Sequence, residues 1–254
     1  DASYRIYKER FANAGDFTFV FVGSFDEDSI KPLLEKYIGS LPGKTQKESF
    51  RDLGIRNPAG KIDKTVNKGA DQKSFVTMVF NQPATYSSKD AYALSCLGEV
   101  MTIKLVEQLR EEKGGVYGVS ANGSMQRIPV TTSMFTISFP CAPENVDTLS
   151  KAAIDELKKI ISNGVSTADL DKVREQQKRK LETDLKQNIF WLSNLADAYY
   201  YGNNPADILN KQKMAEYLTS KMIQDAAKKY INLDKYIRMV LKPEATEEKT
   251  KKAF

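Results

Sequence analysis

The chain has 254 residues, of which 41% are hydrophobic and 28% charged, as in a folded globular protein rather than a disordered one. Its formal net charge is +5, from 38 basic and 33 acidic residues, and so mild an excess does not by itself indicate nucleic-acid binding. No apolar run approaches the roughly 20 residues that a membrane-spanning helix needs. We therefore expect neither a membrane nor a nucleic acid as a partner.

The sequence contains no histidine. This excludes the commonest general base, every Ser-His-Asp or Cys-His arrangement, and the usual zinc ligands. Cys96 and Cys141 match no disulfide framework and no zinc spacing, and isolated thiols of this kind are more often buried fillers than ligands. We expect no metal site in this chain, which is then not a complete hydrolase. Residue 1 is Asp rather than Met, so we also expect a processed product or an excised part of something longer.

The first quarter of the chain predicts a helix, a strand and a second helix. Residues 3–14 are helical by apolar spacing, and 27–39 follow the same pattern. Between them, Phe17–Val22 is dense enough in aromatic and β-branched residues to predict a central, buried strand. Residues 42–60 predict a long surface connection rather than a domain boundary, because a single strand before them could not stand alone.

The middle of the chain predicts two strands, 61–67 and 73–81, followed by a long helix that is capped by Ser87 or Ser88. Gly98 on that helix would let a neighbouring backbone come close. The apolar stripe of the helix consists of Leu94, Leu97, Gly98, Met101, Leu105 and Leu109.

Two strands, 117–126 and 131–140, then form a hairpin with one covered face. A helix runs from Pro143 to about residue 162, and Ser166–Asp169 resembles a capping box at the start of another long helix. The aromatic stretch 190–202 is interpreted as core. A helix at about 219–230 and a strand at 235–241 complete the pattern.

This order of elements predicts an α+β fold: a two-layer α/β sandwich with a mostly antiparallel sheet and helices packed on one face. We expect a single domain over residues 1–242, followed by a flexible tail over 243–254.

The stretch Leu109–Ala121 (LREEKGGVYGVSA) closes the long helix, breaks at a glycine pair and enters a strand. It brings a cation, Arg110, and a phenol, Tyr117, toward one edge. Two interpretations are open on the residues alone. Arg110 can simply complement the negative helix end while Tyr117 lines the edge of the core, or the pair can form part of a functional site.

Several segments together resemble the pitrilysin/insulin-degrading-enzyme family of zinc metallopeptidases, the inverzincins. The resemblance covers about residues 3 to 242, and corresponds to the C-terminal, non-zinc-binding domain. The segments that carry it are Tyr7–Phe11, Phe19–Gly23, Tyr37–Pro42 and, above all, Leu109–Tyr117.

The resemblance implies a clamshell in which an N-terminal half carries the HxxEH motif and binds zinc, while this chain closes the peptide-binding chamber. Arg110 and Tyr117 match a family pair that contacts the substrate backbone and supports the oxyanion, and Gly115 lies beside them as a substrate-binding residue. The implied partners are the N-terminal zinc-binding half, on the same chain or a second subunit, and a peptide substrate. Alone, the chain should be inactive and hold no cofactor.

Two alternatives remain at this point. The chain could be a structural or assembly domain of a catalytically inactive relative, in which case the parent chain would lack the zinc motif as well. A weaker alternative is an acidic-polymer or nucleic-acid binder that uses the basic residues of the long helix after Ser166. Those residues are Lys172, Arg174, Lys178, Arg179 and Lys180. A bacterial origin and a periplasmic or cytoplasmic location fit the resemblance, but no residue selects between the two compartments.

Overall fold

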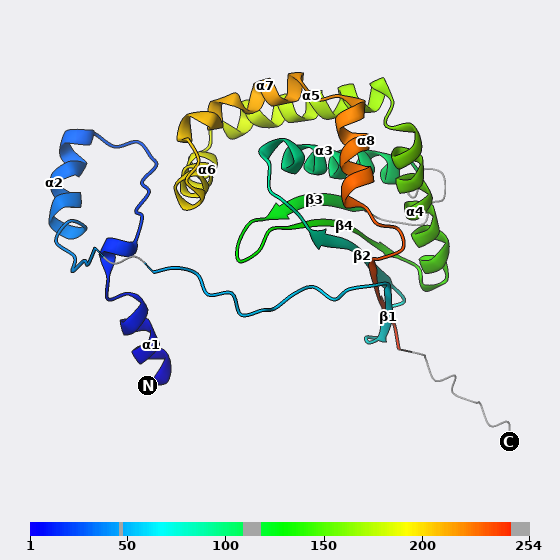
Figure 1. Cartoon of the computed structure of the whole chain (residues 1–254), viewed down its shortest axis with the longest axis horizontal. Coiled ribbons are helices and arrows are strands. Elements are labelled where there is room, and N and C mark those ends of the chain that lie inside the picture. The colour runs from blue at the N-terminus through cyan, green and yellow to red at the C-terminus, as the bar shows by residue number, and fades with distance from the viewer. Residues whose placement is uncertain (46–47, 109–117, 245–254) are drawn as a thin grey trace. The chain divides into compact units, whose positions relative to one another are not determined.

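The computed structural model of the chain describes residues 1–45, 48–108 and 118–244 (Figure 1). The chain divides into two units: Asp1–Arg51 with Gln176–Glu216, and Asp52–Glu175 with Tyr217–Phe254. The single domain expected over 1–242 and the tail expected over 243–254 both stay predictions. Within the described ranges, no helix combines the length and the apolar character that crossing a membrane requires.

The second unit contains a five-stranded sheet in the order β1-β5-β2-β4-β3. β5 pairs in parallel with β1, whereas the β5–β2, β2–β4 and β4–β3 pairs are antiparallel. The predicted mostly antiparallel sheet is therefore confirmed, and β5, the last of the described strands, lies inside the sheet rather than at its edge. The strands are β1 (Ile62–Asn67), β2 (Ser74–Pro83), β3 (Ser120–Gln126), β4 (Thr132–Cys141) and β5 (Ile237–Lys242).

Three helices cover one face of this sheet, as Figure 1 shows: α3 (Ser88–Leu105), α4 (Val146–Asn163) and α8 (Ser220–Tyr230). A short 3-10 turn, η3 (Pro143–Asn145), leads into α4. The strands supply alternate residues to the core beneath the helices, and β4 alternates along its whole length. This is the predicted two-layer arrangement. The largest fully buried side chains are Met78, Phe80, Leu94, Leu97, Met101, Leu105, Phe135, Ile137, Phe139, Leu149 and Leu157.

The helix ends of the second unit follow local sequence signals. The Ser87 hydroxyl accepts a hydrogen bond of 3.0 Å from the Asp90 amide, so Ser87 is the N-cap of α3. α4 ends at Gly164, whose φ of 75° lies in the left-handed region that glycine adopts most easily. α5 (Thr167–Asp184) follows and extends from the second unit into the first.

The described part of the first unit contains helices joined by irregular connections, and no strand. Its N-terminal stretch holds α1 (Ala2–Arg10), the 3-10 turn η1 (Ala14–Asp16) and α2 (Glu27–Tyr37). Its later stretch holds the end of α5, followed by α6 (Asn188–Tyr201), η4 (Pro205–Asn210) and α7 (Lys211–Glu216). The last two elements were not predicted from the sequence.

The strand predicted at Phe17–Val22 is wrong as an element of this chain's sheet. The stretch is extended but belongs to no strand of the described structure, and Phe17, Phe19 and Phe21 are 38%, 41% and 46% exposed. An apolar run becomes a strand only where a neighbouring strand lies within reach, and β propensity depends strongly on that context.

The interpretation of residues 190–202 as core is also wrong. In α6 only Ala198 is buried, and Tyr199 and Tyr200 are exposed. Large apolar residues occupy the whole circumference of this helix, and a helix packed on one side cannot bury all of them.

Candidate functional site

The predicted site residues Arg110, Gly115 and Tyr117 fall in 109–117, outside the described residues. The structure does describe both flanks of this segment. On one side α3 ends at Leu105 and the helix continues through residues 106–108 with a wider, π-type turn. On the other side the chain resumes at Gly118 and enters β3 at Ser120.

The two flanks are held together by a backbone-to-backbone contact between α3 and β3. A Cβ atom added to Gly98 would lie 2.9 Å from the backbone nitrogen of Gly123, and one added to Gly123 would lie 2.0 Å from the carbonyl oxygen of Leu94. Neither position has room for a side chain, so the helix and the strand touch directly. The expectation that Gly98 admits a neighbouring backbone is confirmed.

A hydroxyl group one turn further along α3 extends this contact toward the segment. Thr102 Oγ1 accepts a hydrogen bond of 2.9 Å from the Ala121 amide. The hydroxyl also lies 2.9 Å from the carbonyl oxygen of Gly98 and 3.2 Å from that of Ala121, so its proton has an acceptor. The glycine pair and Thr102 together fix where α3 ends relative to where β3 begins.

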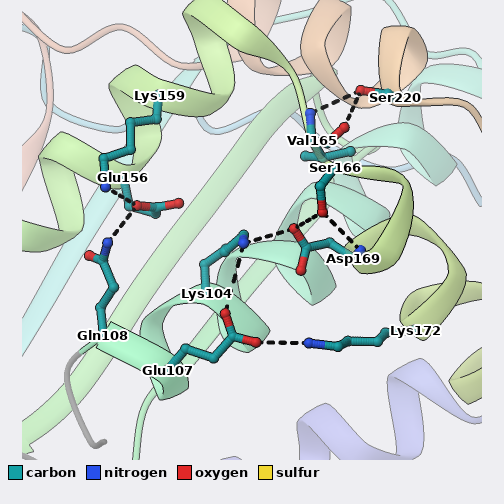
Figure 2. Close-up of polar contacts among 10 residues, drawn as sticks. All are labelled: Lys104, Glu107, Gln108, Glu156, Lys159, Val165, Ser166, Asp169, Lys172 and Ser220. Atoms are coloured by element: carbon teal, nitrogen blue, oxygen red, sulfur yellow. Dashed lines mark hydrogen bonds and ion pairs between the residues drawn. The ribbon is translucent and has the colours of Figure 1, made fainter. Parts of the chain in front are cut away.

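A cluster of charged side chains surrounds the end of α3, as Figure 2 shows. Lys104 Nζ lies 2.8 Å from a carboxylate oxygen of Asp169, and Asp169 is 3% exposed at its side chain. Glu107 lies 3.8 Å from Lys104 and 2.8 Å from Lys172. These pairs connect the last turn of α3 to the first turns of α5.

A second branch of the cluster connects the same helix end to α4. Gln108 donates a hydrogen bond of 3.0 Å to Glu156, and Lys159 lies 2.9 Å from the same carboxylate oxygen (Figure 2). Glu156 is buried, and these two donors give its carboxylate hydrogen-bond partners there. Gln108 is the last described residue before the 109–117 segment, and its side chain is therefore anchored directly to α4.

Asp169 also completes the N-terminus of α5. The Ser166 hydroxyl accepts a hydrogen bond of 3.1 Å from the Asp169 amide, and the same hydroxyl lies 2.6 Å from the Asp169 carboxylate. This confirms Ser166 as the N-cap in the predicted Ser166–Asp169 box, although the Asp169 carboxylate accepts from the Ser166 hydroxyl rather than from its backbone amide. One residue earlier, Val165 exchanges two hydrogen bonds with the Ser220 hydroxyl at the start of α8. The cluster therefore joins α3, α4 and α5, and α8 is attached beside it.

Asp169 and Lys104 form an ion pair in which each group stabilises the charge of the other. Burial by itself would raise the pKa of Asp169, but the hydrogen bonds from Lys104 and Ser166 outweigh burial and hold that pKa below its ordinary value. The hydrogen bond to Asp169 raises the pKa of Lys104. Both groups stay charged at neutral pH, so neither is suited to proton transfer there.

The charged side chains of the cluster hold the helix ends in place rather than take part in catalysis. Three lysines, at 104, 159 and 172, face three carboxylates, at 107, 156 and 169, so the cluster adds no net charge beside the segment. Among the described residues, no group of three or more His, Cys, Asp or Glu side chains could hold a metal ion. Cys96 and Cys141 are both buried and form no disulfide, and burial raises the pKa of the Cys141 thiol to about 11.

Sequence reasoning missed most of these supporting residues. The capping box indicated Asp169, and the glycine indicated the close approach of α3, but Thr102, Lys104 and Glu156 carried no local signal. Part of the basic stretch on α5 is already paired: Arg174 lies 2.9 Å from Asp171, and Lys180 lies 2.7 Å from Asp184. These contacts reduce the charge available to an acidic polymer.

The fold and this junction define a class of protein: a two-layer α+β domain with no metal site among its described residues. Comparison with known families agrees, since the model of the peptidase M16 inactive domain matches residues 3–177. The chain belongs to this family. The predicted resemblance to the non-zinc-binding domain of such peptidases is thereby confirmed.

Individual relatives extend the match along the chain. A probable zinc protease PqqL of Haemophilus influenzae is 25% identical over 223 residues, covering 88% of this chain and 24% of the relative. The structure of the periplasmic protease PqqL from Escherichia coli matches with a TM-score of 0.70 and 19% identity, over 87% of this chain and 25% of that one. A peptidase M16 inactive domain from Pseudomonas fluorescens matches with a TM-score of 0.73 and 15% identity, over 92% of this chain and 55% of that one. The chain spans about a quarter of the length of the curated relatives.

Proposed function

We propose that this chain is the non-catalytic, substrate-binding domain of a zinc-dependent metalloendopeptidase, in which it closes the peptide-binding chamber. Membership of the peptidase M16 inactive-domain family supports this, as do curated relatives described as probable zinc proteases. The absence of histidine from the sequence supports the non-catalytic part of the proposal, because the usual zinc ligands and general base would have to come from elsewhere. The zinc belongs to an N-terminal half, on the same polypeptide or a partner subunit.

In this proposal Arg110 and Tyr117 act on the substrate. Arg110 supplies a permanent charge and fixed donors to the peptide backbone. The Tyr117 hydroxyl donates a hydrogen bond to the oxyanion as the tetrahedral intermediate forms, an interaction worth about 3–4 kcal/mol when well aimed. Gly115 lets the substrate backbone approach closely, because it presents no side chain.

The single observation that carries this proposal is the fixed relation between the two flanks of the 109–117 segment. The glycine contact and the Thr102 hydrogen bond attach α3 to β3, and the charged cluster attaches the end of α3 to α4 and α5. Stabilising an oxyanion requires donors held in place before the reaction, since donors that must reorganise lose most of their effect. The described residues on both sides of the segment are fixed relative to each other, and this supports the proposal.

The test is peptide hydrolysis by the full-length zinc enzyme carrying Arg110→Ala or Tyr117→Phe. Each variant should lower kcat/KM by about 10²-fold, with unchanged zinc content and thermal stability. Arg51→Ala and Tyr217→Phe serve as matched controls, because both side chains are exposed in the described structure. They should leave kcat/KM unchanged.

Unchanged kinetics for both Arg110→Ala and Tyr117→Phe would refute the assigned roles. A parent protein that neither binds zinc nor cleaves peptides would instead favour the alternative, in which the chain is a structural or assembly domain of an inactive relative.

A further inference from the structure

The N-terminal stretch of the chain has apolar side chains but no core of its own. None of the described residues in 1–51 is buried. Both α1 and α2 lack a buried residue, although each has an apolar stripe. Exposed apolar surface on this scale marks a face that contacts something else. The exposed large apolar residues of this stretch are Tyr4, Ile6, Tyr7, Phe11, Phe17, Phe19, Phe21, Phe25, Leu33, Tyr37, Leu41 and Phe50.

The helix α1 repeats the apolar pattern of α8. When residues 2–22 are placed beside 221–241 without a gap, Tyr4, Tyr7 and Phe11 coincide with Ile223, Ala226 and Tyr230. In α8 those three positions are buried against the sheet, at 0%, 5% and 3% exposure. In α1 the matching three are all more than half exposed. The same stripe is therefore present twice, once covered and once uncovered.

The repeat continues through the connection and the strand that follow. Asn13 coincides with Asn232, in the turn after each helix, and Phe17 coincides with Tyr236 at the start of the extended stretch. Phe21 coincides with Val240, which is buried in the middle of β5. Residues 17–22 thus have the pattern of β5 but lack its neighbours.

The position of β5 shows what such a strand needs. β5 lies between β1, to which it is parallel, and β2, to which it is antiparallel, and α8 packs on the face above. A strand in this position between β1 and β2 forms backbone hydrogen bonds with a neighbour on each side. The helix before it then packs on the covered face of the sheet. Residues 2–22 have both parts of this unit, and in the described structure they pair with no strand.

We propose that residues 2–22 are the closing helix and strand of a second domain with the fold of the sheet unit described above. Its remaining strands and helices are supplied from outside this chain. Phe17–Val22 inserts between a parallel and an antiparallel neighbour, as β5 does here, and the Tyr4–Tyr7–Phe11 stripe of α1 covers the sheet beside it.

The receiving domain is a homologous domain rather than a second copy of this chain. In a second copy the corresponding slot is already filled by that copy's own β5. A polypeptide of the curated relatives' length has room for further domains, because this chain spans about a quarter of it. With this assignment, residues 2–22 no longer belong to the single domain that we expected over residues 1–242. The assignment is independent of the proposed roles of Arg110 and Tyr117.

Hydrogen exchange measured by mass spectrometry tests this proposal. The amides of residues 18–22 should exchange rapidly in the 254-residue chain, whereas those of 237–241 exchange slowly. In a polypeptide of the relatives' length that carries these residues, the amides of 18–22 should exchange about 10²-fold more slowly or slower still. Rapid exchange in both proteins would overturn the proposal. Slow exchange of the residue 18–22 amides in the 254-residue chain would also overturn the proposal. This holds if the protection is independent of protein concentration, and so arises within one chain, and equally if it grows with concentration, and so arises from self-association.

Substitution gives a second, independent readout. Phe21→Asp should leave the thermal stability of the 254-residue chain unchanged but abolish the protection of residues 18–22 in the longer polypeptide. Val240→Asp, at the coinciding position of β5, should unfold the sheet unit of the 254-residue chain itself. Phe50→Asp is the control, since Phe50 is also exposed, at 60% against 46% for Phe21, and lies outside residues 2–22. Equal effects of Phe21→Asp and Phe50→Asp in the longer polypeptide would contradict the proposal.

Discussion

Gly98 and Gly123 stand backbone to backbone, with 2.9 Å between a Cβ built on Gly98 and the backbone nitrogen of Gly123. This contact lets α3 lie directly on β3, so that both flanks of the 109–117 segment start from one rigid junction. A side chain at either position would force the helix away from the strand.

Gly123→Ala should therefore destabilise the protein by about 2–3 kcal/mol, because the added Cβ would meet the backbone of Leu94. Gly98→Ala should act in the same direction. Gly118→Ala is the control, since nothing described lies within 4 Å of a Cβ there. Urea unfolding followed by circular dichroism measures all three. Equal stability of Gly123→Ala and Gly118→Ala would show that the junction is looser than the structure indicates.

Thr102→Val should cost about 1–3 kcal/mol, because the Ala121 amide loses its hydrogen-bond acceptor while the shape of the side chain is kept. Thr102→Ser keeps the hydroxyl and should recover most of the loss. Thr183→Val removes a hydroxyl on an exposed helix face and should have little effect. The same unfolding measurement distinguishes these variants. A Thr102→Ser variant as unstable as Thr102→Val would mean that packing of the methyl group, not the hydrogen bond, is what matters.

Asp169→Asn should cost about 3 kcal/mol at pH 7, since it removes a buried carboxylate that pairs with Lys104 and accepts a hydrogen bond from the N-cap residue Ser166. The pKa of Asp169 is lowered in the folded state, so its contribution is present above the unfolded value of about 3.9. That contribution is lost as the pH falls through the lower, folded pKa. The stability difference between wild type and Asp169→Asn should therefore shrink in acid.

Measuring the free energy of unfolding from pH 7 down to pH 3 tests this dependence. Asp171→Asn is the control, because its carboxylate is mostly exposed and its pair with Arg174 should contribute less than about 1 kcal/mol. A wild-type advantage over Asp169→Asn that stays constant down to pH 3 would contradict the ionised pair as its source.

The sequence predicted those features that depend on neighbours along the chain. Ser87 and the Ser166–Asp169 box were recognisable because a cap and its helix are adjacent in sequence. The alternation of β3 and β4 gave the hairpin and its covered face. The two-layer fold followed from the order of these elements, and both the family match and the structure confirm it.

Features that depend on distant partners were not predictable in this way. The pairing of Lys104 with Asp169 joins two helices, and neither residue shows from its local pattern that it will be buried beside the other. Phe17–Val22 has the composition of a buried strand, yet composition cannot say whether the neighbouring strands belong to the same chain. Arg110, Gly115 and Tyr117 stay predictions, since they fall outside the described residues.

The most direct measurement of the central claim is the affinity of the proposed full-length zinc peptidase for a phosphinic peptide, whose tetrahedral centre resembles the intermediate of peptide hydrolysis. If Arg110 and Tyr117 support that intermediate, Arg110→Ala and Tyr117→Phe should raise the inhibition constant in proportion to their loss of kcat/KM. The affinity for the corresponding uncleaved peptide should change far less. An inhibition constant that stays at the wild-type value while kcat/KM falls would contradict the claim that this domain contributes to the transition state.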